Sequence, residues 1–174
     1  MIIKELRDED FVNYKKPSLF LGFPTCSFKC CKEGNLPIEV CQNCSLAKSD
    51  GVDMSPDQIV DRFLSNPITS ASVIGGMEPF DSARDLIDLI HCLRTKTNDD
   101  IVIYTGYTEE EVKNMQYTIN YSFGKQDYSY FGEIAKYPNI IIKFGRFRPN
   151  EDSHYDSVLG VKLVSSNQYA VRIS

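Results

Sequence analysis

Residues 70–104 read SASVIGGMEPFDSARDLIDLIHCLRTKTNDDIVIY, and this stretch decides the fold class. It opens at 70–76 with small and β-branched residues, which predict a buried strand. Leucine and isoleucine then recur at helical spacing across 81–94, and residues 100–104 are again apolar and β-branched. A helix between two such strands is the connection that joins parallel neighbours in a sheet. The stretch therefore predicts an α/β fold with a mainly parallel sheet.

The same alternation of patterns continues on both sides of this stretch. The further predicted elements are a strand over 18–23, a helix opening at Ser55-Pro56, a helix opening at Thr108, and strands over 139–143, 160–164 and 169–173. Residues 116–137 are rich in tyrosine and phenylalanine and fit neither period. Because no repeat, linker or low-complexity tract divides the chain, we expect one domain over residues 1–174.

The charge balance argues against a nucleic-acid ligand, because 24 Asp and Glu residues outnumber 19 Lys and Arg residues and no basic stripe is visible. No apolar run approaches the roughly 18 residues that a membrane span needs. The N-terminal stretch MIIKELRDEDF is charged where a signal peptide would be apolar. We therefore expect a cytoplasmic protein that binds neither nucleic acid nor a membrane.

The cysteines carry most of the information about function. Five of the six lie within residues 26–44, directly after the strand predicted over 18–23. No period holds across 26–53, which predicts a long loop. In a reducing cytoplasm such a group of cysteines is more typical of metal binding than of disulfides. Thiolates select zinc and iron–sulfur clusters, and these five residues alone leave both open, beside reduced cysteines without metal.

Two further unusual segments also follow predicted strands. They are Gly75-Gly76-Met77-Glu78-Pro79 and Thr105-Gly106-Tyr107. Because ligands of α/β sheets bind at the carboxyl ends of the strands, we expect one composite site with the cysteine segment. The glycine pair lets backbone approach a ligand closely, and Glu78 could accept hydrogen bonds from a ligand ammonium group. The alternative for Glu78 is a turn with a solvated acid.

The chain resembles a known superfamily in these segments. Thr25-Cys26-Ser27-Phe28-Lys29-Cys30 is similar to the opening of the radical S-adenosylmethionine (SAM) motif, and residues 75–79 are similar to the GGEP segment that contacts the SAM amino group. Within the superfamily, the chain resembles the activating proteins of anaerobic ribonucleotide reductase. Those proteins have segments similar to residues 10–13, 103–108, 145–147 and 165–168, in the same order along nearly the whole chain.

The resemblance implies a fold, a reaction and a partner. The fold would be a single-domain incomplete (β/α) barrel with the cysteine loop after its first strand. A [4Fe–4S] cluster held by three cysteines would leave one iron for SAM, and reductive cleavage of SAM would give a 5′-deoxyadenosyl radical. The substrate would be a glycine of a glycyl radical enzyme such as anaerobic ribonucleotide reductase. A one-electron donor such as flavodoxin would supply the electron, and no catalytic residue is needed beyond the cofactors.

The resemblance also implies which residues contact SAM. Residues 75–79 supply Gly75, Gly76 and Glu78 to this set, and the next strand end supplies Thr105. Ser165 and Asn167 would reach the SAM carboxylate or ribose if their strand end faces the site, and would otherwise form a turn.

The cysteine motif departs from the family pattern CxxxCxxC, because Glu33 stands three residues after Cys30. In one arrangement, Cys26 and Cys30 are joined by Cys41 or Cys44 from across an insertion. In the other, Cys26 is joined by Cys41 and Cys44, a spacing that resembles the inserted motif of some 7-carboxy-7-deazaguanine synthases. We expect Cys26, Cys30 and Cys41 to be the ligands, with Cys44 as the substitute for Cys41.

Cys31 is excluded from this set because neighbouring residues rarely ligate one cluster together. Two other functions stay open, namely a radical SAM enzyme acting on a small molecule and a non-catalytic zinc-binding module. The aromatic residues of 116–137 either form a docking surface or pack under a long loop.

Overall fold

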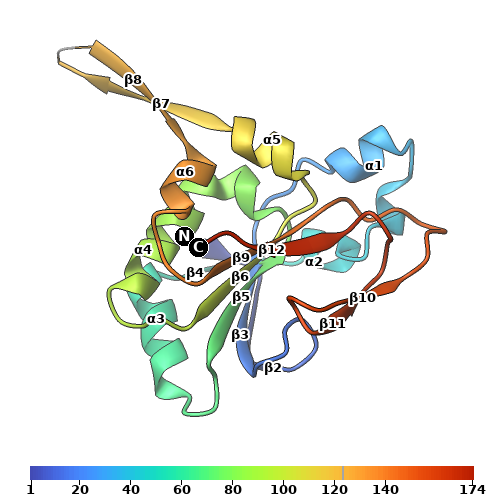
Figure 1. Ribbon diagram of the computed structural model, residues 1–174, viewed down its shortest axis with the longest axis horizontal. Helices are drawn as coiled ribbons and strands as arrows, with labels where there is room; N and C mark the ends of the chain where they lie inside the picture. Colours follow the sequence, from blue (N-terminus) through green and yellow to red (C-terminus); the bar gives the residue numbers. More distant parts are fainter. Residues whose placement is uncertain (123) are drawn as a thin grey trace.

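The computed structural model describes residues 1–122 and 124–174. Its centre is a six-stranded sheet of order β12-β9-β6-β5-β3-β2 (Figure 1). The strands are β2 (Glu5–Asp10), β3 (Ser18–Phe23), β5 (Ala71–Gly76), β6 (Asp100–Tyr104), β9 (Ile140–Phe144) and β12 (Tyr169–Arg172). Strands β3, β5, β6 and β9 run parallel, and the antiparallel β2 and β12 form the two edges of this open sheet.

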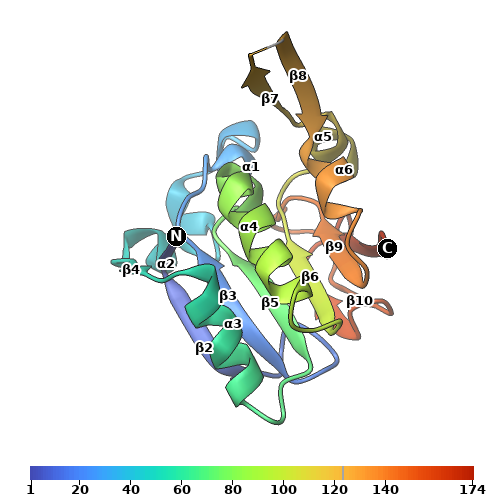
Figure 2. The same cartoon turned by 90° about the vertical axis from the view of Figure 1, so that its left-hand side faces the viewer.

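Two helices cover one face of the sheet, α3 (Pro56–Ser65) and α4 (Ala83–Arg94), as Figure 2 shows. Helix α3 begins after the N-cap Ser55 with proline at its first position, as the sequence predicts, and Ser55 also forms a capping box with Gln58. The buried side chains between the helices and the sheet alternate along each strand, because successive residues of a strand point to opposite faces. On the strands they include Leu19, Leu21, Phe23, Ile74, Ile103 and Ile142, and on the helices they include Phe63, Leu86 and Ile90.

Among the residues that the structure describes, the opposite face of the sheet is covered without helices. Here the hairpin of β10 (His154–Asp156) and β11 (Val161–Leu163) and the segment around Tyr14 lie against the sheet. The buried residues on this side include Phe20, Val73, Val102, Ile141, Leu159 and Leu163. Both faces are therefore closed, and the ends of the parallel strands are left for the loops that form the site.

The edge strand β2 is not predicted by the sequence, because all of its residues ELRDED except Leu6 are charged and only Asp10 is buried. A short strand β1 (Ile2–Ile3) precedes it and pairs with β4 (Val52–Asp53). An edge strand needs no apolar face on its solvent side, so hydropathy does not mark it.

The cysteine segment contains more regular structure than the predicted loop. It holds α1 (Lys29–Glu33), the 3₁₀ helix η1 (Ile38–Val40) and α2 (Cys44–Lys48). Each is one turn or slightly more, which is too short for a hydrophobic period to show. The prediction of a loop without periodic structure is therefore wrong for these residues.

Residues 116–137 form a hairpin and a helix. After α5 (Glu109–Asn114), strand β7 (Gln116–Tyr121) pairs with β8 (Gly124–Ser129), and α6 (Tyr130–Ile134) follows. The hairpin projects from the body of the molecule in both Figure 1 and Figure 2. The aromatic residues of this segment therefore do not simply pack beneath a loop.

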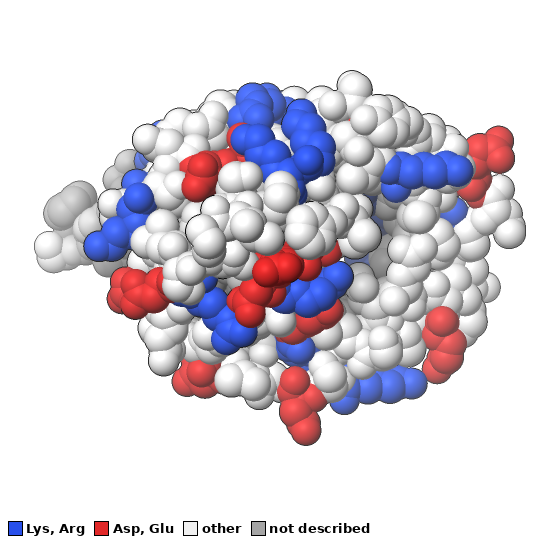
Figure 3. Space-filling model, turned by 90° about the horizontal axis from the view of Figure 1, so that it is seen from below, with Lys and Arg blue, Asp and Glu red and all other residues white. Residues whose placement is uncertain are grey.

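The surface carries charges of both signs. On the face shown in Figure 3, acidic and basic side chains are intermixed. Within residues 1–122 and 124–174, none of the helices has the length and the apolar character that crossing a bilayer requires.

Candidate iron–sulfur site

One cavity of about 330 Å³ lies at the carboxyl ends of the parallel strands. Cys26 and Cys30 from the segment after β3 line it, together with Gly76 at the end of β5, Glu78 after it and Thr105 after β6. The three segments that the sequence places at strand ends thus meet around a single space, where ligands of α/β sheets bind.

Four of the clustered cysteines line this cavity, namely Cys26, Cys30, Cys31 and Cys41. Cys30 interacts electrostatically with Cys26, Cys31 and Cys41, and Cys31 interacts with Cys30, Cys41 and Cys44, so the clustered sulfurs lie near one another. Burial raises the pKa of Cys26 to about 12, opposed by the hydrogen bond that its sulfur accepts from the Phe28 N–H at 3.2 Å. Metal binding at such thiols must therefore displace protons.

The donor set suits iron and sulfide, which soft thiolates prefer. A [4Fe–4S] cluster takes each thiolate on a different iron, so its ligands need not converge on one point. In the part of the chain that the structure describes, no group of three or more His, Cys, Asp or Glu side chains could hold a single metal ion.

The structure distinguishes the surplus cysteines by position. Cys41 lines the cavity, whereas Cys44, the first residue of α2, is not among its lining residues. Cys31 is buried and free, and its thiol donates a hydrogen bond to the sulfur of Cys30, the neighbour in α1. Because the sulfurs of Cys30 and Cys31 lie side by side, the exclusion of Cys31 stays a prediction. The choice of Cys41 over Cys44 also stays a prediction.

Glu78 is buried, with 7 % of its surface exposed, so the alternative of a solvated acid is wrong. Its Oε1 accepts hydrogen bonds from Thr105 Oγ1 at 2.7 Å and Phe80 N at 3.1 Å, and its Oε2 accepts one from Gly106 N at 2.8 Å. Burial raises the pKa of Glu78 to about 7 against these bonds. A carboxylate has about four acceptor positions, so roughly one stays open on Oε2.

The glycine pair has a packing role as well. Gly76 adopts a left-handed φ of 76°, and a Cβ there would stand 2.7 Å from Leu46 Cδ2 and 2.8 Å from Gly22 Cα. The Asn43 amide also donates to the Gly76 carbonyl. Glycine therefore lets the second half of the cysteine segment lie against the end of β5. A Cβ on Gly75 would stand 3.1 Å from Tyr104 Cβ on the neighbouring strand.

Ser165 and Asn167 are absent from the lining of the cavity, although the neighbouring Gln168 lines it. The Ser165 hydroxyl accepts from Arg148 N at 2.9 Å and donates to Arg148 O at 3.2 Å. Asn167 donates to Arg146 O at 3.0 Å. These contacts hold the segment after β9 in place and match the turn that the sequence offers as an alternative role.

Lys143 is a site residue that the sequence reasoning missed. It lines the cavity with only 6 % of its surface exposed, and its Nζ donates to Gly145 O at 2.9 Å. Burial lowers its pKa to about 8, opposed by the charges of Glu78 and Cys30. The available signal is a single charged residue near the end of an otherwise apolar strand, IIIKF.

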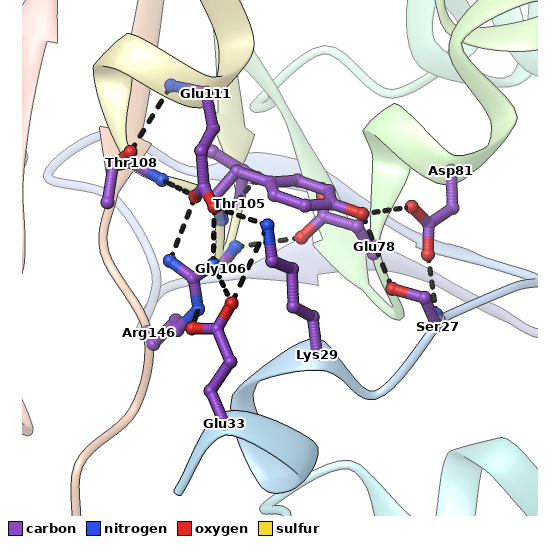
Figure 4. Close-up of polar contacts among 11 residues, drawn as sticks. Ser27, Lys29, Glu33, Glu78, Asp81, Thr105, Gly106, Thr108, Glu111 and Arg146 are labelled. Carbon is purple, nitrogen blue, oxygen red and sulfur yellow. Dashed lines mark hydrogen bonds and ion pairs between the residues drawn. The ribbon is translucent and has the colours of Figure 1, made fainter.

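A network of ion pairs ties the cysteine segment to the rest of the site, and Figure 4 shows its members. We call Lys29, Glu33, Glu111 and Arg146 the loop clamp. Arg146 bonds both carboxylate oxygens of Glu111, at 2.6 and 2.9 Å, and lies 2.8 Å from Glu33 in α1. Lys29 pairs with Glu111 as well. Arg146 is the main reason that the pKa of Glu111 lies well below its usual range.

The loop clamp predicts that Arg146→Ala loosens α1. Removing the partly buried Arg146 guanidinium leaves Glu33 and Glu111 with Lys29, which lies within ion-pair distance of both, and costs on the order of 1–3 kcal/mol. We expect the backbone amides of Lys32 and Gly34 to exchange with solvent roughly ten- to a hundredfold faster, while β5 stays protected. Hydrogen exchange measured by mass spectrometry checks this.

Arg148→Ala is the matched control, because the Arg148 pair with Glu151 is largely exposed, with 61 % of the arginine side chain accessible. Equal exchange in the two variants would show that the loop clamp does not hold α1.

The family comparison agrees with the donor set. The model of the family described as 4Fe-4S single cluster domain matches residues 19–154, from β3 to the start of β10. No curated protein and no solved structure matches the chain. The match covers more than half of the chain and includes the whole cysteine segment. This protein therefore belongs to the 4Fe-4S single cluster domain family.

Proposed function

We propose that this iron–sulfur protein is a radical SAM enzyme that forms a glycyl radical on a partner protein. One observation carries the proposal. The cysteine segment, the glycine–carboxylate segment after β5 and the turn after β6 line a single cavity. The family membership is the basis for proposing a [4Fe–4S] cluster. The resemblance to the activating proteins of anaerobic ribonucleotide reductase is the basis for the proposed reaction and partner.

The fold belongs to the same proposal. We infer that the open sheet is an incomplete (β/α) barrel of the radical SAM type, within one domain spanning residues 1–174. Four central parallel strands support this, together with helices α3 and α4 on one face and ligand segments at the carboxyl ends of β3, β5 and β6.

The cavity offers charges that complement an amino-acid end group. SAM carries an ammonium and a carboxylate on its methionine portion. Glu78 has an acceptor position open on Oε2, and Lys143 has three donors of which one is used on Gly145. Glu78 would hold the ammonium and Lys143 the carboxylate, each in a buried setting where charged hydrogen bonds are strong.

In this proposal Cys26, Cys30 and Cys41 hold the cluster, and the remaining residues bind, orient and exclude water. The bound cofactors supply the hard step, one-electron cleavage of SAM to a 5′-deoxyadenosyl radical. The chain needs no general acid or base for this chemistry. A glycine Cα–H of the partner is the hydrogen donor, and a donor such as flavodoxin supplies the electron.

The test is reductive SAM cleavage by anaerobically reconstituted protein. We expect 5′-deoxyadenosine and methionine in equal amounts by mass spectrometry, and a protein-centred radical by electron paramagnetic resonance when a glycyl radical enzyme is added. Cleavage without a radical on any such partner would favour a small-molecule substrate. A colourless protein that holds zinc and leaves SAM intact would overturn the proposal.

A prediction for Lys143 follows from its burial. Lys143→Met keeps the length of the side chain but removes the buried cation, so a charged hydrogen bond worth about 1.5–3 kcal/mol is lost. SAM affinity is expected to fall roughly ten- to a hundredfold while the iron content stays unchanged. Anaerobic titration calorimetry measures the affinity.

Lys162→Met is the control, because Lys162 also lines the cavity but is exposed, where solvent screens its charge. If the two variants bind SAM equally well, Lys143 does not contact it.

A further inference from the structure

The β7–β8 hairpin is an incomplete sheet. It stands away from the body of the molecule (Figures 1 and 2), and it forms a two-stranded sheet of its own. An isolated two-stranded hairpin is marginal in water, and three or more strands with an apolar face are needed for independent stability. In the described residues, no third strand pairs with either β7 or β8.

The two faces of the hairpin differ in character. Alternation places Tyr117, Ile119 and Tyr121 on one face, where Tyr117 lies opposite Tyr128. The rings of Tyr117 and Tyr128 stack with centroids 5.5 Å apart, and the hydroxyls of Tyr121 and Tyr128 lie 2.8 Å apart. The hairpin therefore carries one ordered aromatic face.

The other face is polar. Thr118 lies opposite Asp127 and donates to it at 2.6 Å, and Asn120 lies opposite Lys125. This face gives the hairpin a side that water can cover.

The outer edge of β7 is open for pairing. At the base of the hairpin, Tyr130 N–H donates to Met115 O. Hydrogen-bonded residues alternate along an antiparallel ladder, so Thr118 and Asn120 turn their backbone N–H and C=O groups outward. Strand β7, with the sequence QYTINY, has no charge and no proline, whereas β8 carries Lys125 and Asp127. Charges and prolines are the usual protection of an edge, and β7 lacks them.

We propose that β7 pairs antiparallel with β7 of a second copy of this chain, which makes a four-stranded sheet across a two-fold axis. The register sets Ile119 opposite Ile119, and Tyr117 of one copy opposite Tyr121 of the other. It also sets Thr118 opposite Asn120, so that the outward backbone groups of the two strands meet. An isologous contact of this kind closes as a dimer and leaves the charged β8 strands at the outer edges.

A second copy fits this edge because the strand complements itself in the proposed register. Every residue of the aromatic face meets a residue of the same face, and uncharged polar residues meet on the other face. Across the four strands, Thr118 and the Asn120 of the other copy lie between Asp127 at one end and Lys125 at the other. No two residues of like charge therefore lie opposite each other. The proposal does not depend on the reaction or on the cluster.

The test compares two proline variants of the reconstituted protein by sedimentation velocity over a range of concentrations. Thr118→Pro removes an outward N–H from β7, and Asp127→Pro does the same on the outer edge of β8. Both variants lose the same Thr118–Asp127 hydrogen bond, and each leaves the bonds between β7 and β8 in place. The wild type and Asp127→Pro are expected to dimerise, and Thr118→Pro is expected to self-associate at least about tenfold more weakly.

A wild type that stays monomeric at every concentration overturns the proposal, even if the β7 edge binds another protein. Equal self-association of the two variants also overturns it. If both prolines disrupt the hairpin, hydrogen exchange on the wild type decides the matter. The amides of Thr118 and Asn120 should become protected only as the dimer forms. Exchange rates of these amides that do not change when the dimer forms are evidence against this edge.

Discussion

Replacing Cys30 by alanine is expected to leave the anaerobically reconstituted protein without its cluster, so that iron falls from about four atoms per chain to nearly none. Cys30 lines the same cavity as Cys26 and Cys41, the two other expected ligands. Removing it takes away one of three thiolates, and a cluster held by two protein ligands is not retained. Iron and acid-labile sulfide analysis measures the loss.

Cys31→Ala is the matched control for Cys30→Ala, because it removes the adjacent thiol in the same short helix. It is expected to keep its iron. Loss of iron from Cys31→Ala with retention in Cys30→Ala would reverse the assignment of these two residues.

The same measurement separates the two candidates for the third ligand. Cys41→Ala is expected to lose iron as Cys30→Ala does, because Cys41 lines the cavity. Cys44→Ala is expected to keep it, because Cys44 lies outside the lining in α2. The opposite result would give the third position to Cys44. Retention of iron by Cys30→Ala together with loss by both Cys41→Ala and Cys44→Ala would support the alternative spacing with Cys26.

Residue patterns predicted the parts of the fold that depend on local spacing. Helices α3 and α4 follow from apolar residues at helical intervals, and β5 and β6 follow from β-branched runs. The cavity could also be anticipated, because the carboxyl ends of parallel strands meet at one edge of a sheet. The tertiary contacts that join distant segments could not be anticipated. The pairing of Glu33 with Arg146 spans the chain, and neither residue has a local pattern that marks its partner.

Lys143 and the hairpin show two further limits of sequence reasoning. Lys143 is buried in the wall of a cavity that it shares with Cys30 and Glu78, which are distant from it in the sequence. Its hydrogen bond to Gly145 O is local and does not mark this burial. In β7 and β8, tyrosines at alternate positions lie among polar residues and β8 has charges, so hydropathy identifies no strand.

The stability of the metal-free protein is expected to fall as the pH rises from about 4.5 to about 7, because of Glu78. Its pKa is raised from 4.5 in the unfolded chain to about 7 in the folded protein, chiefly by burial. The folded state therefore binds the proton more tightly, so the contribution to stability is fully present below about pH 4.5 and is lost as the pH passes the folded pKa. The difference corresponds to a loss on the order of 3 kcal/mol by about pH 8.

Glu78→Gln tests the origin of this pH dependence. The amide cannot ionise, so the variant should not show the fall in stability. Its NH2 group cannot accept a hydrogen bond, so at least one of the Thr105, Gly106 and Phe80 donors loses its acceptor and stability is lower at every pH. Urea unfolding of both proteins at about pH 5 and about pH 8 gives the difference between their pH dependences, in which titrating groups that do not interact with Glu78 cancel. Lys143 interacts with Glu78, so the comparison is repeated in the Lys143→Met background. Identical slopes would show that Glu78 ionises as an ordinary carboxyl group.

If Glu78 accepts a hydrogen bond from a ligand ammonium, saturating SAM should favour the carboxylate form of Glu78, because a nearby cation lowers the pKa of a buried acid. SAM should then reduce the fall in stability with pH in the wild type but not in Glu78→Gln.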